Sequence, residues 1–444
     1  MINDHLEVIS FLYLLFSVIG IITVIREIHK SHKISIMSMC NIMYIAVLCI
    51  IPALILYGYS SESNAKDFIK YEQEYLWTFY VQLIITVIGY VFFNLGYCIK
   101  QRDREKKETQ KKDNTILISV LFSVISLISL LLWASGYGGI TGLLDNANFI
   151  RAGWIKSSNS FTFFKHFVPL ALLASWMLFN AIIKRKIDKF VRKVIVLLLL
   201  VLNIAISSIY IQANDGRLLL AIYILLFFVI YLKYIYETKS VKIMLLLFRF
   251  AIVLLVFVVI LFNADSILRD LRGETPIEEK NATVLENISD EFSFIILGTQ
   301  TALEHNYSDN AELMIDNDVI NGVFAWLPYS MKPIILEDVW DHNTRLINTK
   351  SYGQSPTSIV AQSVYDLGLV GIIIIPFLYG MFIKKTEKLL EAYKNNVFYE
   401  TIYVALGFYL SKGIPYFSLY NIMINTFFIF VAIFIYKFVQ KVKF

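Results

Sequence analysis

The chain has 444 residues, of which 57% are hydrophobic and only 17% charged, with a mean hydropathy of +0.63 and a formal net charge of +5. A soluble globular protein has about 25% charged residues, so this composition excludes a soluble fold. The three cysteines have no disulfide or zinc-binding spacing. We therefore expect an all-α polytopic membrane protein that forms a single integral domain over residues 1–444.

Apolar segments recur along the chain at lengths that suit membrane-spanning helices. A helix needs about 20 apolar residues to cross the hydrocarbon core. The sequence predicts eleven such helices, at 7–25, 35–57, 75–98, 115–134, 166–183, 194–211, 217–232, 243–263, 358–383, 398–411 and 416–436. The first segment follows acidic residues and lacks a small-residue cleavage site, so we expect a retained helix rather than a secretory signal.

The positions of lysine and arginine predict the orientation of these helices, because basic loops resist translocation. If the N-terminus is outside, the inside segments hold 26 of the 40 basic residues. These segments are 26–34, 99–114, 184–193, 233–242, 384–397 and 437–444. We interpret the most basic ones as topology anchors, with lipid or nucleic-acid binding as the alternative. The N-terminus is then outside and the C-terminus cytoplasmic, and no nucleic-acid partner is needed.

Two predicted outside loops, 135–165 and 264–357, are much longer than the other connections. Loops of this length are usually functional unless they are disordered. The second contains the segment ATVLENISDEFSFIILGTQTALEH, whose apolar residues recur at helical spacing. We therefore expect the large loop to be partly helical, with a helix lying across the outer face.

Several common motifs are absent, and their absence narrows the function. The sequence has no GxxxxGK[ST], GxGxxG, HExxH or GxSxG motif, which disfavours ATP-driven transport and serine hydrolysis. Glycine and proline within the apolar segments show no repeat of the kind found in secondary transporters. The short sequence Asp316–Asp318 is too weak to indicate a metal site, and we expect neither a metal nor a cofactor.

Arginine is concentrated on the predicted outer face, where it can bind phosphate groups. The residues are Arg151, Arg217, Arg269, Arg272 and Arg345. The planar guanidinium group binds phosphate at two points, which a lysine cannot do. Arg217 and Asp215 belong to a short turn between two apolar segments, where an unpaired charge costs about 3 kcal/mol. The alternative is an Asp215–Arg217 pair that only caps this turn.

A second polar cluster leads from the large loop into the ninth predicted helix. The segment WDHNTRLINTKSYGQSPTSIVAQSVYDLGLVG contains Asp341, His342, Arg345, Tyr352 and Gln354. A histidine beside carboxylates can act as a general base, and Arg345 can hold a phosphate leaving group. The alternative is that His342 is an ordinary residue of a solvated loop. Asp366, within the helix, is expected to face the protein interior.

Three stretches carry a resemblance to a known family. They are YGGITGLLDNANFIR, NDGRLLLAIYILLFFVIYL and YGQSPTSIVAQSVYDLGLVGIIIIPFLYGMFI. Together with the helix number and the late outer loop, they make the chain resemble the bacterial oligosaccharide repeat unit polymerases, the Wzy-type O-antigen and capsule polymerases.

The resemblance implies a membrane-embedded glycosyltransferase of lipopolysaccharide or capsule biosynthesis that uses neither nucleotide sugars nor a metal. Such an enzyme transfers a growing glycan from undecaprenyl pyrophosphate to the non-reducing end of a new lipid-linked repeat unit, at the outer face of the bacterial cytoplasmic (inner) membrane. A chain-length regulator and a flippase of the same pathway are the protein partners that it implies.

The resemblance also assigns roles to residues of this chain. Arg151, Arg217 and Arg345 match arginine-bearing stretches of the family, and we expect them to bind pyrophosphate. We predict catalytic roles for Arg217, Arg345 and, as the base, His342. The predicted substrate-binding residues are Arg151, Arg269, Arg272, Asp215, Asp341, Tyr352 and Gln354.

Three other functions are compatible with parts of this pattern. An O-antigen ligase has a similar helix number, outer loop and arginines but a different acceptor. A lipid-linked oligosaccharide flippase predicts a charged central cavity and two related halves, and the sequence indicates neither. A sensor or structural membrane protein does not require arginines gathered on one side.

Overall fold

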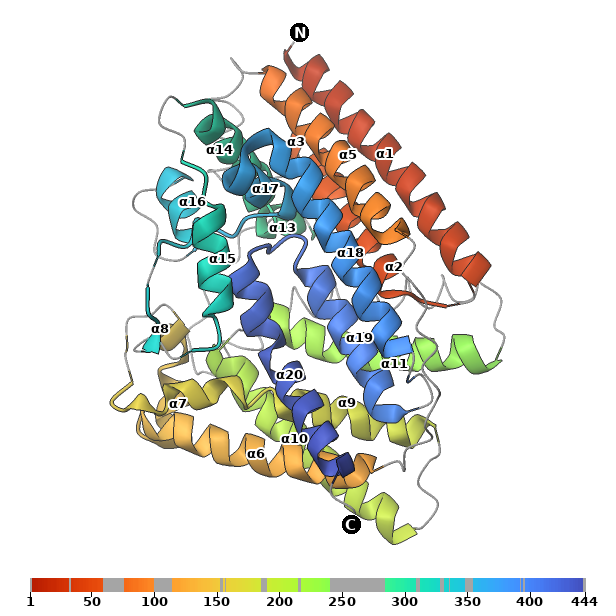
Figure 1. Cartoon of the computed structure of the whole chain (residues 1–444), viewed down its shortest axis with the longest axis vertical. Coiled ribbons are helices and arrows are strands. Elements are labelled where there is room, and N and C mark those ends of the chain that lie inside the picture. The colour runs from red at the N-terminus through yellow and green to blue at the C-terminus, as the bar shows by residue number, and fades with distance from the viewer. Residues whose placement is uncertain are drawn as a thin grey trace. The chain divides into compact units, whose positions relative to one another are not determined.

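The computed structural model describes most of the chain, and within it every regular element is helical (Figure 1). The described residues are 2–31, 33–58, 76–99, 114–151, 155, 157–184, 190–214, 217–239, 284–308, 312–327, 331–334, 336–347, 354–391, 393 and 396–441. The chain divides into two compact units. The first unit comprises 1–104, 279–389 and 407–425, and the second comprises 105–278, 390–406 and 426–444. The single integral domain over residues 1–444 stays a prediction.

The first unit begins with long apolar helices. Helix α1 spans Ile2–Ser31 and α5 spans Leu76–Cys98. Between them, α2 (Ile36–Ile45), the π-helical turn η1 (Ala46–Ile50) and α3 (Ile51–Leu56) form one apolar rod. The side chain of Ser35 caps this rod by accepting a hydrogen bond from the Ser38 N–H at 2.8 Å. The π turn ends two residues before Pro52, whose missing N–H disturbs regular α-helical bonding.

The remainder of the first unit consists of short helices followed by a long one. The short helices are α13 (Val284–Glu291), α14 (Phe294–Tyr307), α15 (Ile315–Val323), α16 (Val339–Ile347), α17 (Ile359–Leu367) and the 3-10 turn η5 (Gly368–Val370). The long helix α18 (Gly371–Glu391) packs backbone to backbone against α5. A Cβ on Gly96 would lie 2.0 Å from the Phe377 carbonyl oxygen, and one on Gly380 would lie 2.0 Å from that of Phe93. Paired glycines of this kind let membrane helices approach closely.

The second unit is arranged around one buried helix. Its elements are α6 (Thr115–Ser135), α7 (Gly139–Asp145), α8 (Ala147–Arg151), η3 (Ser160–His166), α9 (Leu170–Ile183), α10 (Phe190–Asn214) and α11 (Arg217–Lys239). Helix α9 packs against α6, α10 and α11, and nearly all its side chains are buried. A buried hydrogen bond joins α11 to α9, where the Tyr223 hydroxyl donates to Ser175 Oγ at 2.9 Å. Helices α19 (Val397–Lys412) and α20 (Leu419–Lys441) each contribute residues to both units.

Nine helices within the described residues are long and apolar enough to cross a membrane, so the chain is a multi-pass α-helical membrane protein. These nine agree with nine of the eleven predicted segments. The segment 243–263 lies outside the described residues. The segment 398–411 is the helix α19, whose 16 residues are short for a span. The predicted orientation is not tested by these lengths and stays a prediction.

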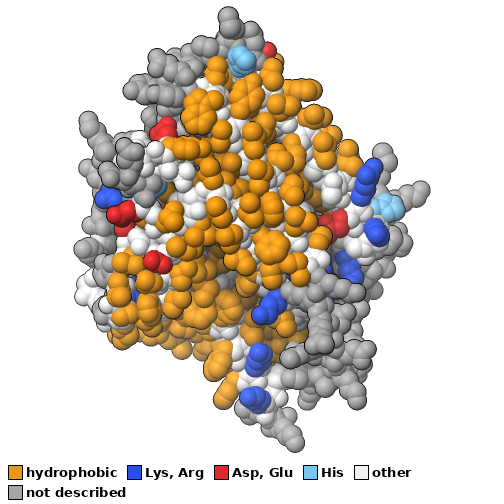
Figure 2. Space-filling model, turned by 45° about the horizontal axis from the view of Figure 1, so that its top comes forward, with side chains coloured by type: hydrophobic (Ala, Val, Ile, Leu, Met, Phe, Trp, Pro, Cys, Tyr) orange, Lys and Arg blue, Asp and Glu red, His pale blue; other side chains and the backbone are white. Residues whose placement is uncertain are grey.

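The surface of the first unit agrees with a lipid environment. Helix α1 exposes a series of large apolar side chains, among them Phe11, Leu15 and Ile19. Figure 2 shows hydrophobic side chains gathered over this unit, with charged side chains at the edges of the area. Exposed apolar surface of this extent is unfavourable in water, whereas lipid tails cover it without cost.

Candidate active site

Four short helices of the first unit, α14 to α17, bring the predicted cluster around His342 together (Figure 1). Helix α16 begins where Asp338 caps it. The Asp338 carboxylate accepts the Trp340 N–H at 2.9 Å, and its carbonyl accepts the His342 N–H at 3.0 Å. Burial raises the pKa of the Asp338 carboxyl, and the Trp340 N–H opposes this shift. The cap therefore fixes the first turn of the helix that carries His342.

The buried face of α16 is held by side-chain hydrogen bonds. Asn343 is fully buried and donates from Nδ2 to the Ser355 carbonyl at 3.1 Å. Its Oδ1 accepts the Tyr365 hydroxyl at 2.9 Å. Thr344 Oγ1 accepts the Ser355 N–H at 2.6 Å. These bonds fix the rotation of α16 about its axis, and its opposite face carries His342 and Arg345.

His342 lies beside a carboxylate and a guanidinium group. Its Nδ1 is 3.5 Å from a Glu337 carboxylate oxygen and 3.5 Å from Arg345 Nη2, and Arg345 forms an ion pair with Glu337. The Glu337 carboxylate can only accept a hydrogen bond and the Arg345 guanidinium can only donate one, so the two neighbours favour opposite tautomers of the ring. Because Arg345 already has Glu337 as its ion-pair partner, we place the ring proton on Nδ1, where it faces the carboxylate. Nε2 then carries a lone pair, and it is buried with no hydrogen-bond partner among the described residues. This is the arrangement of a base oriented by a carboxylate.

Two further rings enclose His342. Its ring centroid lies 5.0 Å from that of His305 on α14 and 5.9 Å from that of Tyr365 on α17. The His305 Nε2 lies 3.2 Å from the Glu312 carbonyl oxygen, which can only accept, so this nitrogen carries the proton. The two rings keep water away from His342, whose side chain is 20% exposed.

This environment favours the neutral imidazole. Desolvation lowers the pKa of His342 from its ordinary value of 6.5, and the neighbouring His305 and Arg345 lower it further, whereas Glu337 raises it. The net direction is downward. His342 is therefore neutral at pH 7, which is the form that can accept a proton.

Part of the predicted site is present around this histidine. Arg345 is adjacent to His342, and Gln354 donates to the Asp341 carboxylate at 2.8 Å. Asp366 is buried, as expected, and one of its oxygens accepts from Gln362 Nε2 at 3.1 Å. Several polar residues of the segment from Asp341 to Asp366 are therefore hydrogen-bonded to one another.

The other predicted residues belong to the second unit or lie outside the described residues. Arg217 begins α11 and Arg151 ends α8, both in the second unit, and only their backbone is described. The remaining predicted residues, Asp215, Arg269, Arg272 and Tyr352, lie outside the described residues. A joint site of Arg217 with His342 stays a prediction.

The structure adds two residues that the sequence did not single out, Glu337 and His305. Glu337 directly precedes Asp338, the cap of α16. Three acidic residues lie close to His342 in the sequence, and the sequence alone does not show which of them contacts the histidine. His305 lies 37 positions before His342, in the last turn of α14. The one feature of the sequence that points to His305 is that it ends the segment ATVLENISDEFSFIILGTQTALEH, which we expected to be helical.

The chain was compared with protein-family models, with curated proteins and with solved structures, and none of these comparisons gave a match.

Proposed function

We propose that this chain is a polymerase of lipid-linked oligosaccharide repeat units, a metal-independent glycosyltransferase acting at the outer face of the bacterial cytoplasmic membrane. The observation that carries the proposal is His342, whose buried Nε2 has no hydrogen-bond partner among the described residues while Glu337 faces its Nδ1. This base stands beside Arg345 and shortly before the apolar helical segment Ile359–Glu391. A proton acceptor and a phosphate-binding cation next to a membrane span suit a lipid-linked substrate.

In the proposed reaction, His342 Nε2 removes the proton from a hydroxyl group of the acceptor sugar. The hydroxyl oxygen bonds to the anomeric carbon of the donor glycan. The bond between that carbon and the pyrophosphate oxygen breaks, and undecaprenyl pyrophosphate leaves with the bonding electrons. Negative charge grows on the leaving group, and one preorganised donor that stabilises such charge contributes about 2.7–4 kcal/mol.

Arg345 is suited to meet this charge because its present partner is easily exchanged. Its side chain is 65% exposed and that of Glu337 is 34% exposed. Exposed ion pairs of this kind contribute about 0–1 kcal/mol. A pyrophosphate group offers more negative charge and two-point geometry, so Arg345 can transfer from Glu337 to the substrate. Glu337 then remains to orient His342.

A gene deletion followed by glycan gel electrophoresis tests the function. Loss of long glycan with retention of single repeat units on the surface glycolipid supports a polymerase. Loss of all surface-attached glycan would assign the chain as an O-antigen ligase. Accumulation of undecaprenyl-linked units inside the cell would assign it as a flippase. Normal glycan would exclude all three.

The predicted role of Arg217 is tested in the complemented deletion strain. Arg217→Ala is expected to abolish polymer while the protein remains inserted and abundant, as checked by immunoblotting of membranes. Arg217→Lys keeps the charge but loses the planar fork, and we expect it to restore little polymer. Full activity of the lysine variant would contradict two-point binding of pyrophosphate, and long polymer from the alanine variant would contradict any catalytic role.

A further inference from the structure

A polar seam runs between α6 and α10, which lie side by side in the second unit (Figure 1). Helix α6 contributes Ser119, Ser123 and Ser126, which are four and three residues apart, and Trp133 follows on the same face. Helix α10 contributes Asn203. All five residues are buried, with at most 3% of any one of them exposed. From Ser119 to Trp133 the seam covers about 21 Å of α6, and the five residues include no charged side chain.

A hydrogen bond across the seam joins the two helices and fixes the orientation of the Asn203 amide. Asn203 Nδ2 donates to Ser123 Oγ at 2.7 Å and to the Leu199 carbonyl at 2.7 Å. Because a backbone carbonyl can only accept, the atom facing it must be the amide nitrogen. Asn203 Oδ1 is therefore an acceptor, and it has no hydrogen-bond partner within the described part of the chain.

Three further polar atoms of the seam are unpartnered. The hydroxyl oxygens of Ser119 and Ser126 and the indole nitrogen Nε1 of Trp133 are buried, and none has a hydrogen-bond partner among the residues that the structure describes. The ring centroids of Trp133 and Tyr210 are 6.1 Å apart, so α10 still accompanies α6 at the level of Trp133. Buried polar atoms are nearly always bonded to protein or to an ordered small molecule. Four unpartnered atoms on two packed helices therefore indicate that the seam binds a ligand.

The chemistry of the unpartnered atoms determines what this ligand must be. Trp133 Nε1 can only donate, Asn203 Oδ1 can only accept, and a serine hydroxyl can do both. A metal cation cannot accept from the indole N–H, an anion cannot donate to the amide carbonyl, and the seam has no charge to balance either ion. A small neutral molecule that both donates and accepts suits all three kinds of group. Because the atoms are spread over several helical turns, more than one such molecule is needed.

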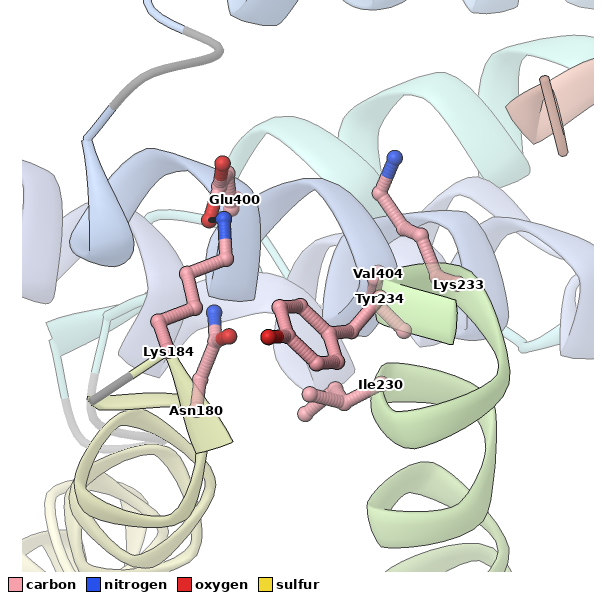
Figure 3. Close-up of a pocket in the computed structure, with 7 residues that line it drawn as sticks. All are labelled: Asn180, Lys184, Ile230, Lys233, Tyr234, Glu400 and Val404. Carbon is pink, nitrogen blue, oxygen red and sulfur yellow. Dashed lines mark hydrogen bonds and ion pairs between the residues drawn. The ribbon is translucent and has the colours of Figure 1, made fainter. Parts of the chain in front are cut away.

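We propose that the seam between α6 and α10 is a binding site for ordered water molecules. A buried water makes about three hydrogen bonds to polar groups that otherwise lack a partner. Lipid tails offer no hydrogen bonds, so waters held inside the unit complete the polar contact between these two helices. None of the seam residues belongs to the candidate active site or lines the pocket between α9, α11 and α19 that Figure 3 shows. The proposal is therefore independent of the proposed function.

X-ray radiolysis of the purified full chain in lipid nanodiscs, followed by mass spectrometry, tests for water beside Trp133. Radicals formed from a bound water oxidise the side chain next to it, whereas a dry buried side chain is protected. Trp176 is the matched reference, because it is also fully buried in the second unit and its Nε1 donates to the Tyr223 carbonyl at 3.2 Å. We expect Trp133 to be oxidised several times faster than Trp176. Equal or slower oxidation of Trp133 would overturn the proposal.

Ser119→Ala and Ser126→Ala test the middle of the seam, because each removes a hydroxyl that has no bond to another described residue. If waters bind these hydroxyls, each variant lowers the thermal unfolding midpoint by about 1–2 °C. Loss of a dry, unpartnered hydroxyl would leave the midpoint unchanged or raise it, and this result would overturn the proposal. Ser208→Ala is the control on α10, because the Ser208 hydroxyl donates to the Ile204 carbonyl of its own helix at 2.9 Å. An equal fall in this control would show that the seam is not the cause, which would also overturn the proposal.

Discussion

Two regions of this protein combine a glutamate with cations, and they differ in what else they contain. The candidate active site pairs Glu337 with Arg345, whose side chain is 65% exposed. The second region, at the ends of α9 and α19, pairs Glu400 with Lys184, whose side chain is 22% exposed. The first pair stands beside a histidine with an unpartnered nitrogen among the described residues, whereas no histidine lines the pocket that contains the second pair. The first region is therefore suited to proton transfer, and the second joins two helices.

The supporting structure differs in the same way. Helix α16 has nine residues, too few to be stable alone, and its orientation depends on bonds from Asp338, Asn343 and Thr344 to backbone groups. The pocket is placed at the ends of long apolar helices, which hold their positions through burial of whole faces. The geometry of the candidate active site therefore depends on a few polar bonds, whereas the position of the Lys184–Glu400 pair depends on helix packing.

The largest effect is expected for His342→Gln. Glutamine retains hydrogen-bonding groups but cannot accept the proton, so polymer formation should fall by about 10²–10⁴-fold. The measurement is the rate of polymer formation from lipid-linked repeat units in membranes. His5→Gln is the control, because His5 is an exposed histidine of the same unit that contacts Tyr80. If His342→Gln retained more than about a tenth of the wild-type rate, His342 would not be the base of this reaction.

Opposite changes in pH dependence are expected when the two neighbours of His342 are altered. The neutral form of the base is active, so the rate falls as pH decreases through the pKa of His342, which lies below 6.5. Glu337 raises this pKa and Arg345 lowers it. Glu337→Gln should therefore move the acidic limb of the rate profile to lower pH, and Arg345→Gln should move it to higher pH.

Measurement of kcat/KM from pH 4.5 to 8 separates these two shifts from a general loss of activity. Arg345→Gln should also lower the plateau, by about 10²-fold if it stabilises the leaving group. Glu400→Gln, in the second unit, removes a carboxylate that is not among the groups shifting the pKa of His342, and it should leave the limb where it is. Shifts of the same sign in the Glu337 and Arg345 variants would contradict His342 as the titrating group.

The sequence predicted the features that depend on residues close together in the chain, and it missed those that depend on contacts between distant residues. A membrane-spanning helix is predicted from one continuous segment, because an apolar run of about 20 residues is long enough to cross the bilayer as a helix. Nine of the predicted segments agree with helices long enough to cross. The contact of Asp341 with Gln354 also joins residues close in sequence. The π turn before Pro52 was not predicted, because a strain within an apolar helix leaves the hydropathy pattern unchanged.

The missed residues depend on tertiary contacts. His305 contacts His342 because α14, α16 and α17 pack together. The spacing of apolar residues predicts each helix but not which helices pack against each other. Glu337 faces the ring because Asp338 is used as the cap of α16, which leaves the preceding residue outside the helix. The sequence shows that both Glu337 and Asp338 are close to His342, but it does not show that Asp338 caps the helix and Glu337 contacts the histidine.

The smallest effect is expected from Asp318, which links the short helices to a long one. Its carboxylate is buried and accepts the Leu419 N–H with its two oxygens, at 2.9 and 3.1 Å, and so caps α20. Asp318→Ala removes the acceptor and should lower the free energy of unfolding by about 1 kcal/mol, measured as a lower thermal midpoint. Asp318→Asn keeps one acceptor oxygen and should lose less. Asp316→Ala is the control, because Asp316 is exposed on the same helix.

The Asp318 variants also test how the short helices support the candidate active site. Polymer formation should decrease together with the midpoint in Asp318→Ala, because α15 and α17 pack together in the group of short helices around His342. A lower midpoint in Asp318→Ala with an unchanged rate of polymer formation would show instead that the cap at the start of α20 does not support the site around His342.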